Sequence, residues 1–493
     1  MRERKAAGLL IRVDARRGEL QRQIYSGLRQ AILDGVVGPG ERLPSSRELA
    51  ADLGVSRTTS QLALEQLLAE GYLTTRRGSG TFVARELPDD APPLRSSPAP
   101  AGLRHPPLSK RGEALVATRP AARRVGGPPR PFRIGTPALD LFPVRIWSQL
   151  WSRRLRRATP SQLDYGEAAG FPALRQAIAD HVRAARGTRC SADQVFIVPG
   201  AQRAIDGICR LLLDPGDEAW LEEPGYPGAH SALVGAGARI HSIRVDDDGL
   251  DVEAGERQGV RARLVYVTPS HQFPLGVPMS LARRLALLKW ASSVGAWVIE
   301  DDYDSEFRYG AHPIPCLHGL DVEGRVIYVG SFSKTLFPSL RLGFMIVPPD
   351  LHDTLLTVRR NADTYPPLLD QAVLADFLLE GHFERHLRRM RVVYLERLQA
   401  LEQALLRRCA GGLRLRPTRT GLHAVADLVE AGSREVFAEA TARRVEVTPL
   451  DAYFFGSTPS PNALVLGFGS ARPDSIDDGV RRLAAAIEAA RLS

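Results

Sequence analysis

Prolines divide this chain of 493 residues into two parts. The 44 residues 88–131 contain eleven prolines, with serine, alanine, glycine and arginine between them, and almost no periodic apolar pattern. Such a composition does not bury enough apolar surface to fold, and proline-rich spacers stay extended. We therefore expect a Pro/Arg-rich linker at residues 86–131, between an N-terminal domain at 14–85 and a C-terminal domain at 132–493.

The net positive charge is confined to the first quarter of the chain. Residues 1–131 contain 22 Lys and Arg against 13 Asp and Glu, whereas residues 132–493 contain 43 of each. An arginine-rich composition without a specific role would spread the excess evenly. The asymmetry therefore indicates that the N-terminal part binds a polyanion, and the arginines of the linker can contribute to nucleic-acid contacts.

The composition is typical of a globular cytoplasmic protein. Hydrophobic residues make up 44% and charged residues 25%, and no apolar run approaches the ~18 residues that a membrane-spanning helix needs. The N-terminus lacks the apolar segment and cleavage site of a secretion signal. Four cysteines without CxxC spacing suggest neither a zinc site nor a disulfide framework; they are Cys190, Cys209, Cys316 and Cys409. We expect no membrane segment and no bound metal.

The N-terminal domain has the pattern of a helix-turn-helix. An amphipathic helix is expected at residues 20–33, ended by Gly35. Ser45 and Glu48 then have capping-box spacing, and Gly54 provides the turn before a second helix that Ser56 caps. Base-reading and phosphate-binding side chains lie at the exposed N-terminal ends of such helices. The candidates are Ser46, Arg47, Ser56, Arg57, Thr58 and Gln61.

Two short strands follow and form a basic β-wing around Arg76 and Arg77. Residues 18–85 resemble the winged helix-turn-helix of the GntR family through the motifs Pro-Ser-Ser-Arg, Leu-Gly-Val-Ser-Arg and Gly-Ser-Gly-Thr-Phe-Val. Ser60 and Leu64 stand where we would expect Val and Tyr, a difference that concerns local packing and not the reading face. The resemblance implies binding to double-stranded operator DNA.

Short apolar strands alternate with helical patterns in the C-terminal domain. The strands are expected at residues 194–198, 263–267, 296–299 and 326–329. Uninterrupted apolar strands separated by helices are typical of a mostly parallel sheet covered on both faces. The sequence therefore predicts an α/β domain.

A lysine with a distinctive neighbourhood follows one of these strands. Ser331 and Ser333 precede Lys334, and Arg341 follows it by seven residues. An isolated lysine is usually a solvated charge. Here two hydroxyls and a guanidinium can bind a phosphate while the amine bonds to an aldehyde. This combination favours pyridoxal phosphate (PLP).

Other segments fit the same cofactor. Residues 298–303, Val-Ile-Glu-Asp-Asp-Tyr, end a strand with carboxylates that can keep a pyridinium nitrogen protonated and a phenol that can bind a ring hydroxyl. Residues 199–202 lie between a strand and a helix whose N-terminus can bind phosphate. Tyr226 offers a flat surface against the ring, and Tyr165 lies where the domain opens.

Residues 132–493 resemble the fold-type I aminotransferases, and the order of the two domains resembles the MocR subgroup of GntR regulators. The resemblance implies that Lys334 forms the internal aldimine, that Asp301 pairs with the pyridine nitrogen and that Tyr303 binds the ring hydroxyl. Tyr165 would contact the cofactor of a second subunit in a homodimer. The phosphate would be bound by Ser331, Ser333, Arg341, Ala201 and Gln202.

Two departures from working aminotransferases concern the substrate. Phe273 stands where those enzymes place a ring-contacting asparagine, and the last strand, 463–468, is apolar where an arginine would bind the substrate carboxylate. Three other arginines could bind the substrate carboxylate from another position: Arg472, Arg414 and Arg416. The alternative is that they are ordinary surface residues. The departures favour a sensor, and the alternative is a competent aminotransferase with a DNA-binding appendage.

The sequence thus predicts a cytoplasmic transcription regulator that binds DNA, PLP and a second copy of itself. An amino-acid effector needs a cation for its carboxylate, which the last strand lacks, whereas PLP does not. We therefore expect PLP, or its adduct with an amino acid, to be the effector, as in the PdxR-type members of the subgroup, which control vitamin B6 synthesis. No dinucleotide fingerprint, P-loop or HExxH motif occurs. His271 and His318 are interpreted as local hydrogen-bonding residues.

Overall fold

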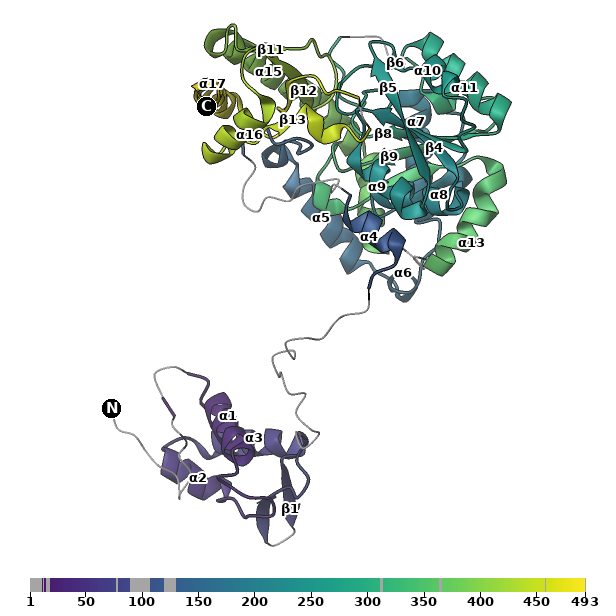
Figure 1. Ribbon diagram of the computed structural model, residues 1–493. Helices are drawn as coiled ribbons and strands as arrows, with labels where there is room; N and C mark the ends of the chain where they lie inside the picture. The colour runs from purple at the N-terminus through teal and green to yellow at the C-terminus, as the bar shows by residue number, and fades with distance from the viewer. Residues whose placement is uncertain are drawn as a thin grey trace. The chain divides into compact units, whose positions relative to one another are not determined.

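The computed structural model divides the chain into two compact units, residues 1–107 and 108–493. It describes residues 11, 13–14, 18–76, 79–88, 107–118, 130–310, 314–362, 366–456 and 458–492. Figure 1 shows both units. Among the described residues, every helix is too short or too polar to cross a membrane.

The first unit is the predicted helix-turn-helix followed by two strands. It contains α1 (Leu20–Leu33), α2 (Ser46–Leu53), α3 (Arg57–Ala69), β1 (Leu73–Arg76) and β2 (Gly80–Val83). The two strands pair antiparallel and form the wing, and Arg42 adds an isolated bridge to Phe82. The helices enclose a core whose fully buried members include Ile24, Leu28, Leu49, Ala63 and Leu67.

A helix that the sequence analysis did not predict lies inside the predicted linker. It is α4 (Lys110–Val116), and the Ser109 hydroxyl caps it by accepting the backbone N–H of Gly112 at 3.0 Å. The helix packs against α9 (Pro227–Ala236) of the second unit. Seven residues span only two turns, too few to produce a recognisable period in a proline-rich stretch.

The second unit is built on an eight-stranded sheet in the order β3-β10-β9-β8-β7-β4-β5-β6. All strands run parallel except β10 and the short β6. The predicted mostly parallel sheet is therefore present. Its strands are β3 (Val195–Val198), β4 (Glu218–Glu223), β5 (Arg239–Asp246), β6 (Gly249–Leu250), β7 (Leu264–Val267), β8 (Trp297–Asp302), β9 (Val326–Ser331) and β10 (Gly343–Ile346).

Helices cover both faces of this sheet, as Figure 1 shows. One face packs on α8 (Ala201–Leu212), α9 and α13 (His352–Ala362). The other packs on α7 (Pro172–Arg186), α10 (Val252–Arg257), α11 (Leu281–Val294), α12 (Leu317–Leu320) and α14 (Leu368–Leu379). Strand residues alternate between the faces: Tyr266 contributes to one core and Val265 and Val267 to the other.

A smaller antiparallel sheet completes the unit, in the order β11-β12-β14-β13. Its strands are β11 (Leu413–Leu415), β12 (His423–Leu428), β13 (Thr448–Pro449) and β14 (Ala463–Gly467). It packs on α15 (His382–Arg408), α16 (Ser433–Ala442) and α17 (Pro473–Leu492), while α5 (Val144–Arg156) and α6 (Pro160–Leu163) lie beside α14. The two sheets meet near the ends of β7 and β8, where the candidate site lies.

Candidate cofactor site and DNA-binding face

Lys334 lies directly after β9 in a half-buried position. Its Nζ donates a hydrogen bond to the backbone oxygen of Gly135 at 2.6 Å. Gly135 has φ +72°, a conformation that favours glycine, and a Cβ atom there would stand 2.6 Å from Nζ and would displace the amine. Burial lowers the pKa of the Lys334 ammonium, although Asp304 and Asp301 oppose that shift. A lowered pKa leaves more of the amine unprotonated near neutral pH, and the unprotonated amine is the form that attacks an aldehyde.

Asp301 is the second-last residue of β8, the strand next to β9, so it lies at the same edge of the sheet as Lys334. Its Oδ2 accepts a hydrogen bond from the Tyr266 hydroxyl at 2.6 Å, whereas Oδ1 is buried and has no hydrogen-bond partner. Burial raises the pKa of this carboxyl to about 7, against the stabilising bond from Tyr266. An N–H donor at Oδ1 would satisfy the orphaned acceptor and stabilise the ionised form.

The Tyr303 hydroxyl lies 2.9 Å from Nδ1 of His271. Tyr303 follows β8, and His271 lies in the loop after β7, so neighbouring strands bring the two side chains together. Tyr226 precedes α9 and is half-buried, with its ring edge-to-face against Phe273 at a centroid distance of 5.7 Å. Burial raises the pKa of the Tyr226 hydroxyl.

A cluster of donors surrounds the N-terminus of α8, which begins with Ala201 and Gln202. Gly200 precedes it with φ +87°, and a Cβ atom there would stand 3.3 Å from the Arg341 guanidinium. Arg341 donates to the oxygen of Pro199 at 2.9 Å. Gln202 donates to Gly228 at 2.8 Å, while its Oε1 is buried without a partner. A helix N-terminus beside a guanidinium is suited to a phosphate.

The serines of the lysine motif lie close to each other, since the Ser331 hydroxyl accepts the backbone N–H of Ser333 at 3.1 Å. Tyr165 is the exception among the predicted residues. It lies in the loop after α6 with 79% of its surface exposed. A tyrosine that exposed contributes little to a site within its own chain.

The helix-turn-helix has the predicted local structure. Ser45 and Glu48 form both bonds of the capping box, Gly54 has φ +64°, and the Ser56 hydroxyl accepts the N–H of Thr59 at 3.1 Å. Arg47, Ser56, Arg57, Thr58 and Gln61 are exposed, and Ser46 is half-buried. The domain therefore presents its predicted reading residues on the surface.

The buried Ser60 explains the first departure from the expected pattern. It replaces apolar packing with a hydrogen bond, since its hydroxyl donates to the backbone oxygen of Ser46 at 2.7 Å and so ties α3 to α2. In the wing, the exposed Arg76 lies 4.8 Å over the ring of Phe82. Arg77 lies outside the described residues. Arg42, a further exposed basic residue beside the wing, was missed because it precedes the recognisable motif.

Comparison with known proteins identifies both units. Residues 142–460 match the family "Aminotransferase class I and II", and residues 20–83 match "Bacterial regulatory proteins, gntR family". The chain is 43% identical to the probable rhizopine catabolism regulatory protein MocR of Rhizobium meliloti, over 95% of this chain and 94% of that protein. This chain belongs to the MocR subgroup of GntR-family transcription regulators.

Other relatives of this MocR-type chain support the same family assignment. It is 31% identical to the pyridoxine biosynthesis regulator PdxR of Corynebacterium glutamicum, over 92% of this chain and 93% of that one. The second unit is similar to the α-aminoadipate aminotransferase LysN of Thermus thermophilus, solved with N-(5'-phosphopyridoxyl)-L-leucine. That likeness has 31% identity and a TM-score of 0.67, and covers 73% of this chain and 92% of LysN. The fold-type I prediction is confirmed, and the family implies PLP as the cofactor.

The substrate side of this MocR-type domain is apolar in the structure. Leu464, Val465 and Leu466 of β14 are fully buried. Phe273 packs edge-to-face against Tyr226, Tyr303, His423 and Tyr453, with centroid distances between 5.1 and 5.9 Å. An aromatic cluster therefore occupies the region where the resemblance places polar substrate contacts.

The arginines considered as replacements lie in other surroundings. Arg416 donates to both carboxylate oxygens of Asp427, with the shortest bond at 2.7 Å. Arg472 is mostly exposed and lies 3.7 Å from Asp140, and Arg414 is exposed on β11. Two of the three are thus engaged with carboxylates of the chain itself.

Five residues that lie behind the cofactor motifs were not predicted as site residues from the sequence: Gly135, Glu222, Tyr266, Asp304 and His423. Glu222 is buried and accepts from the Thr268 hydroxyl at 2.6 Å and its backbone N–H at 3.1 Å. Burial raises the pKa of Glu222 to about 7. These residues lie in segments far apart along the chain, and none of them belongs to a local sequence motif that would have identified it.

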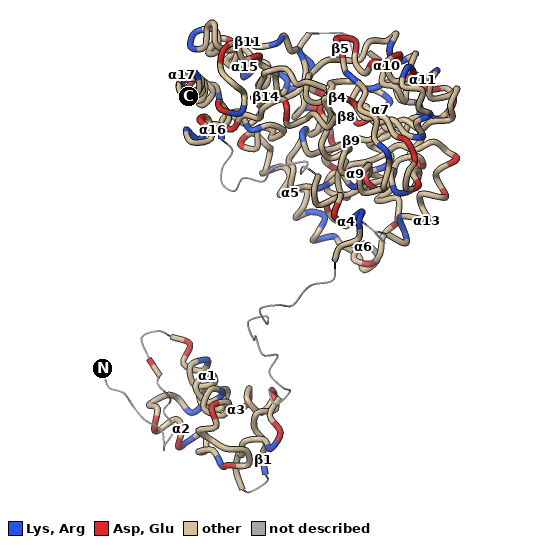
Figure 2. The backbone as a smooth tube through the Cα atoms, viewed as in Figure 1, with Lys and Arg blue, Asp and Glu red and all other residues tan. Residues whose placement is uncertain are grey.

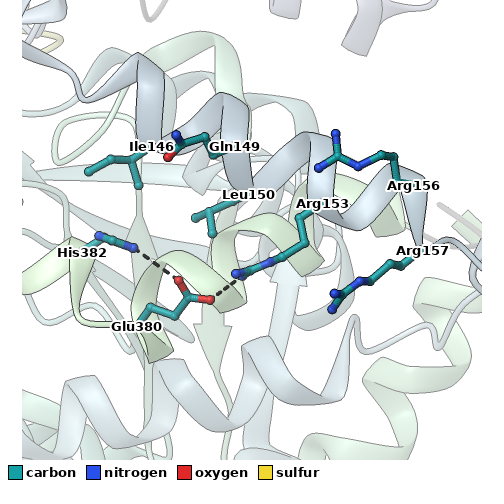
Figure 3. A pocket seen from close by; sticks show the side chains of 8 residues that line it. All are labelled: Ile146, Gln149, Leu150, Arg153, Arg156, Arg157, Glu380 and His382. Carbon is teal, nitrogen blue, oxygen red and sulfur yellow. Dashed lines mark hydrogen bonds and ion pairs between the residues drawn. The ribbon is translucent and has the colours of Figure 1, made fainter.

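A shallow hollow of about 390 Å³ lies on the surface beside α5, apart from the cofactor motifs. Figure 3 shows Glu380 between His382 and Arg153, with both contacts drawn. Figure 2 shows basic positions along this helix, and Arg153, Arg154 and Arg156 form its last turn. None of the lining residues belongs to the Lys334 cluster, so we assign the hollow no part in PLP binding.

Proposed function

We propose that this chain is a PLP-dependent transcription regulator whose N-terminal domain binds operator DNA and whose C-terminal domain acts as a sensor. The observation that carries the proposal is the convergence of Lys334, the orphaned Oδ1 of Asp301 and the donors around α8 at one edge of the large sheet. These groups match the aldehyde, the pyridinium and the phosphate of PLP in kind.

The residues present fit the cofactor. Asp301 would accept from the pyridinium N–H, and Tyr303 would bind the ring hydroxyl. Tyr226 would lie against the ring face, and Lys334 would hold the cofactor covalently. The phosphate would be held by Ser331, Ser333, Arg341, Ala201 and Gln202. When bound, PLP supplies an electrophilic carbon conjugated to an electron-withdrawing ring.

The arrangement supports a sensor over an enzyme. Transamination requires that the substrate carboxylate be oriented, and the buried part of β14 offers no cation for it. Phe273 places an aromatic ring beside Tyr226 and Tyr303 instead of an amide. Competent transamination is the alternative that measured turnover would reveal.

We propose that two copies form a homodimer in which the exposed Tyr165 completes the partner's phosphate site. A dimer presents two winged helices to two half-sites, so the second binding event becomes intramolecular and apparent affinity rises. A regulator of this kind acts on DNA in the cytoplasm.

For the effector we propose PLP itself or its adduct with an amino acid, and for the regulated process vitamin B6 metabolism. The apolar β14 supports this because PLP needs no carboxylate clamp. The likeness to PdxR supports it as well, although the relatives also include a rhizopine catabolism regulator.

Operator binding by three preparations tests the proposal: apo protein, PLP-loaded protein, and PLP-loaded protein with candidate amino acids. A ligand shifts an equilibrium only by its differential affinity for the two states, so PLP must change DNA affinity or half-site preference. Equal binding with and without PLP, together with a response to one amino acid, would overturn PLP as effector. Steady-state turnover with amino donors would instead establish that the chain is a competent aminotransferase.

A further inference from the structure

Three buried side chains next to the cofactor motifs are used by none of the roles above. They are His271, Asp304 and His423, each at most 2% exposed. His271 comes from the loop after β7, Asp304 from the segment after β8, and His423 from the start of β12 in the small sheet. The group therefore lies where the two sheets meet.

The contacts of His271 fix where its ring carries a proton. Nδ1 lies 2.9 and 3.2 Å from the two carboxylate oxygens of Asp304. A carboxylate only accepts, so Nδ1 carries the proton and donates it. The Tyr303 hydroxyl oxygen lies 2.9 Å from the same nitrogen and accepts a share of that N–H. The hydroxyl proton of Tyr303 is then free to be donated elsewhere.

The imidazole has little room to change its orientation. A Cβ atom on Gly421 would stand 2.0 Å from its Cε1, and one on Gly276 would stand 3.1 Å from its Nε2, so two glycine backbones enclose the ring. His423 lies beside it at a ring-centroid distance of 4.9 Å. Burial, together with His271, lowers the pKa of His423 to about 3, so His423 is neutral and its Nε2–H donates to Pro274 at 3.1 Å.

These three residues are also the group in the described part of the chain whose spacing would suit a metal ion. However, Nδ1 of His271 already donates to Asp304, and Nε2 of His423 donates to a backbone oxygen. These two nitrogens thus have partners within the protein, whereas Nε2 of His271 is buried without one. The hydrogen-bonded His271–Asp304 pair accounts for the short spacing without an ion.

We propose that the His271–Asp304 pair orients the Tyr303 hydroxyl so that it donates its proton to the ring hydroxyl oxygen of PLP. This inference rests on the proposed PLP site. His271 and Asp304 are positioning residues, since they act through Tyr303. A hydrogen bond donated to the ring oxygen stabilises its anion, which favours loss of the proton from the Lys334–PLP imine. The pair therefore holds the pKa of the imine down.

Direct electrostatics predicts the opposite sign, which makes the inference testable. The charged groups that face Tyr303 and Lys334 are Asp301, Asp302, Asp304 and Glu222, and the neutral His423 lies beside them. Removing the negative charge of Asp304 would by itself destabilise a protonated imine and lower its pKa. Removing an orienting bond would raise it.

The experiment is a pH titration of the visible absorption of PLP-loaded full-length protein. Asp304→Asn removes the charged acceptor that keeps the proton on Nδ1, so the imidazole proton can move to Nε2 and the Nδ1 lone pair then accepts the Tyr303 hydroxyl proton. With Tyr303 turned away from the ring oxygen, we expect the imine to bind its proton at least tenfold more tightly. Tyr303→Phe should give a similar shift, and Tyr303→Phe combined with Asp304→Asn should add nothing further.

Three further variants serve as controls. His271→Asn keeps an N–H donor near the Nδ1 position and should titrate like the unmodified protein, whereas His271→Leu should shift like Asp304→Asn. His318→Gln, a change at another buried histidine that packs on Tyr328, should leave the titration unchanged. An unshifted or lowered imine pKa in Asp304→Asn would overturn the inference. Absence of any visible band in the unmodified protein would instead overturn the proposed PLP site.

Discussion

Lys334 differs from a surface lysine in two physical respects. Its amine is partly desolvated, which disfavours the ammonium, and a glycine backbone oxygen 2.6 Å away fixes its direction. The sequence motif singles out Lys334 as a candidate, but it does not predict the backbone oxygen that fixes the direction of the amine. Gly135 lies 199 positions earlier, and only the fold brings it to the amine.

Replacing Lys334 by Ala should abolish covalent cofactor attachment, because no other amine occupies this position. The chain contains only four lysines, at positions 5, 110, 289 and 334, so borohydride reduction followed by peptide mass analysis should locate the PLP adduct on Lys334 alone. Lys289→Ala, at an exposed position on α11, is the matched control. A visible band that persists in Lys334→Ala would disprove the assignment.

Arg57 should contribute more to operator binding than arginines away from the reading helix, since it is the first residue of α3 and its side chain is exposed. If Arg57 contacts a base, Arg57→Ala should cost about 1 to 3 kcal/mol at one operator position; if it contacts a phosphate, the log-log salt slope should fall by roughly 0.9. Fluorescence anisotropy at several salt concentrations separates these outcomes. Arg22→Ala on α1 is the control, and equal effects of the two changes would contradict the placement of the reading helix.

At the scale of elements, local sequence signals predicted the individual helices and turns, whereas the tertiary contacts of those elements could not be predicted. The capping box at Ser45 and the turn at Gly54 depend on neighbours within a few residues, so the sequence contains the whole motif. The docking of α4 depends on α9, more than one hundred residues away, and the sequence between residues 86 and 131 indicates only a linker. Phe273 was recognised as a departure, but its four aromatic neighbours come from distant segments.

Leu115 should hold α4 on α9. A Cβ atom at Gly235 of α9 would stand 3.6 Å from the Leu115 methyl carbon, and the hydroxyls of Ser231 and Thr118 lie 2.9 Å apart. Leu115→Asp should undock the helix and speed tryptic cleavage at Lys110 and Arg111. Val116→Asp changes a neighbour that is 75% exposed and should leave the cleavage rate as it is. Equal rates for all three proteins would show that α4 is not held by this contact.

The link between α7 and α15 should give a pH-dependent stability. His181 lies 2.9 Å from Glu384 and 3.9 Å from Glu306; burial alone would lower its pKa, but the two carboxylates raise it to about 9. A raised pKa stabilises the fold below the unfolded value of about 6.5, and this contribution is lost as the pH rises through 9. His181→Gln should therefore destabilise the second unit by about 2 to 3 kcal/mol at pH 6 and far less at pH 10. Thermal unfolding at the two pH values checks this, and a pH-independent loss would contradict it.

At the scale of the whole molecule, the charge asymmetry and the prolines predicted two units with different partners, because these are properties of composition. Assembly is harder to predict from one chain. Tyr165, 79% exposed within its own subunit, is the residue whose proposed role requires a second copy.

Full-length protein should sediment as a dimer at micromolar concentration, with or without PLP. Tyr165→Phe should keep the dimer while weakening PLP binding, because the substitution removes one hydroxyl donated across the interface. Equilibrium dialysis with PLP measures that loss. A monomer, or a Tyr165→Phe variant with unchanged PLP affinity, would contradict the proposed shared site.

The docking of α4 also limits how far the DNA-binding domain travels from its anchor. If all of residues 86–131 served as a tether, its contour length would be about 165 Å at 3.6 Å per residue. With α4 docked, only residues 89–106 separate the described segment that ends at Pro88 from the one that begins at Pro107, and their contour length is at most about 65 Å. That distance corresponds to about 19 base pairs of B-DNA at 3.4 Å each. While α4 stays on α9, the DNA-binding domain can move from that anchor no farther than this tether and its own dimensions allow, so operator spacing and helix docking are coupled.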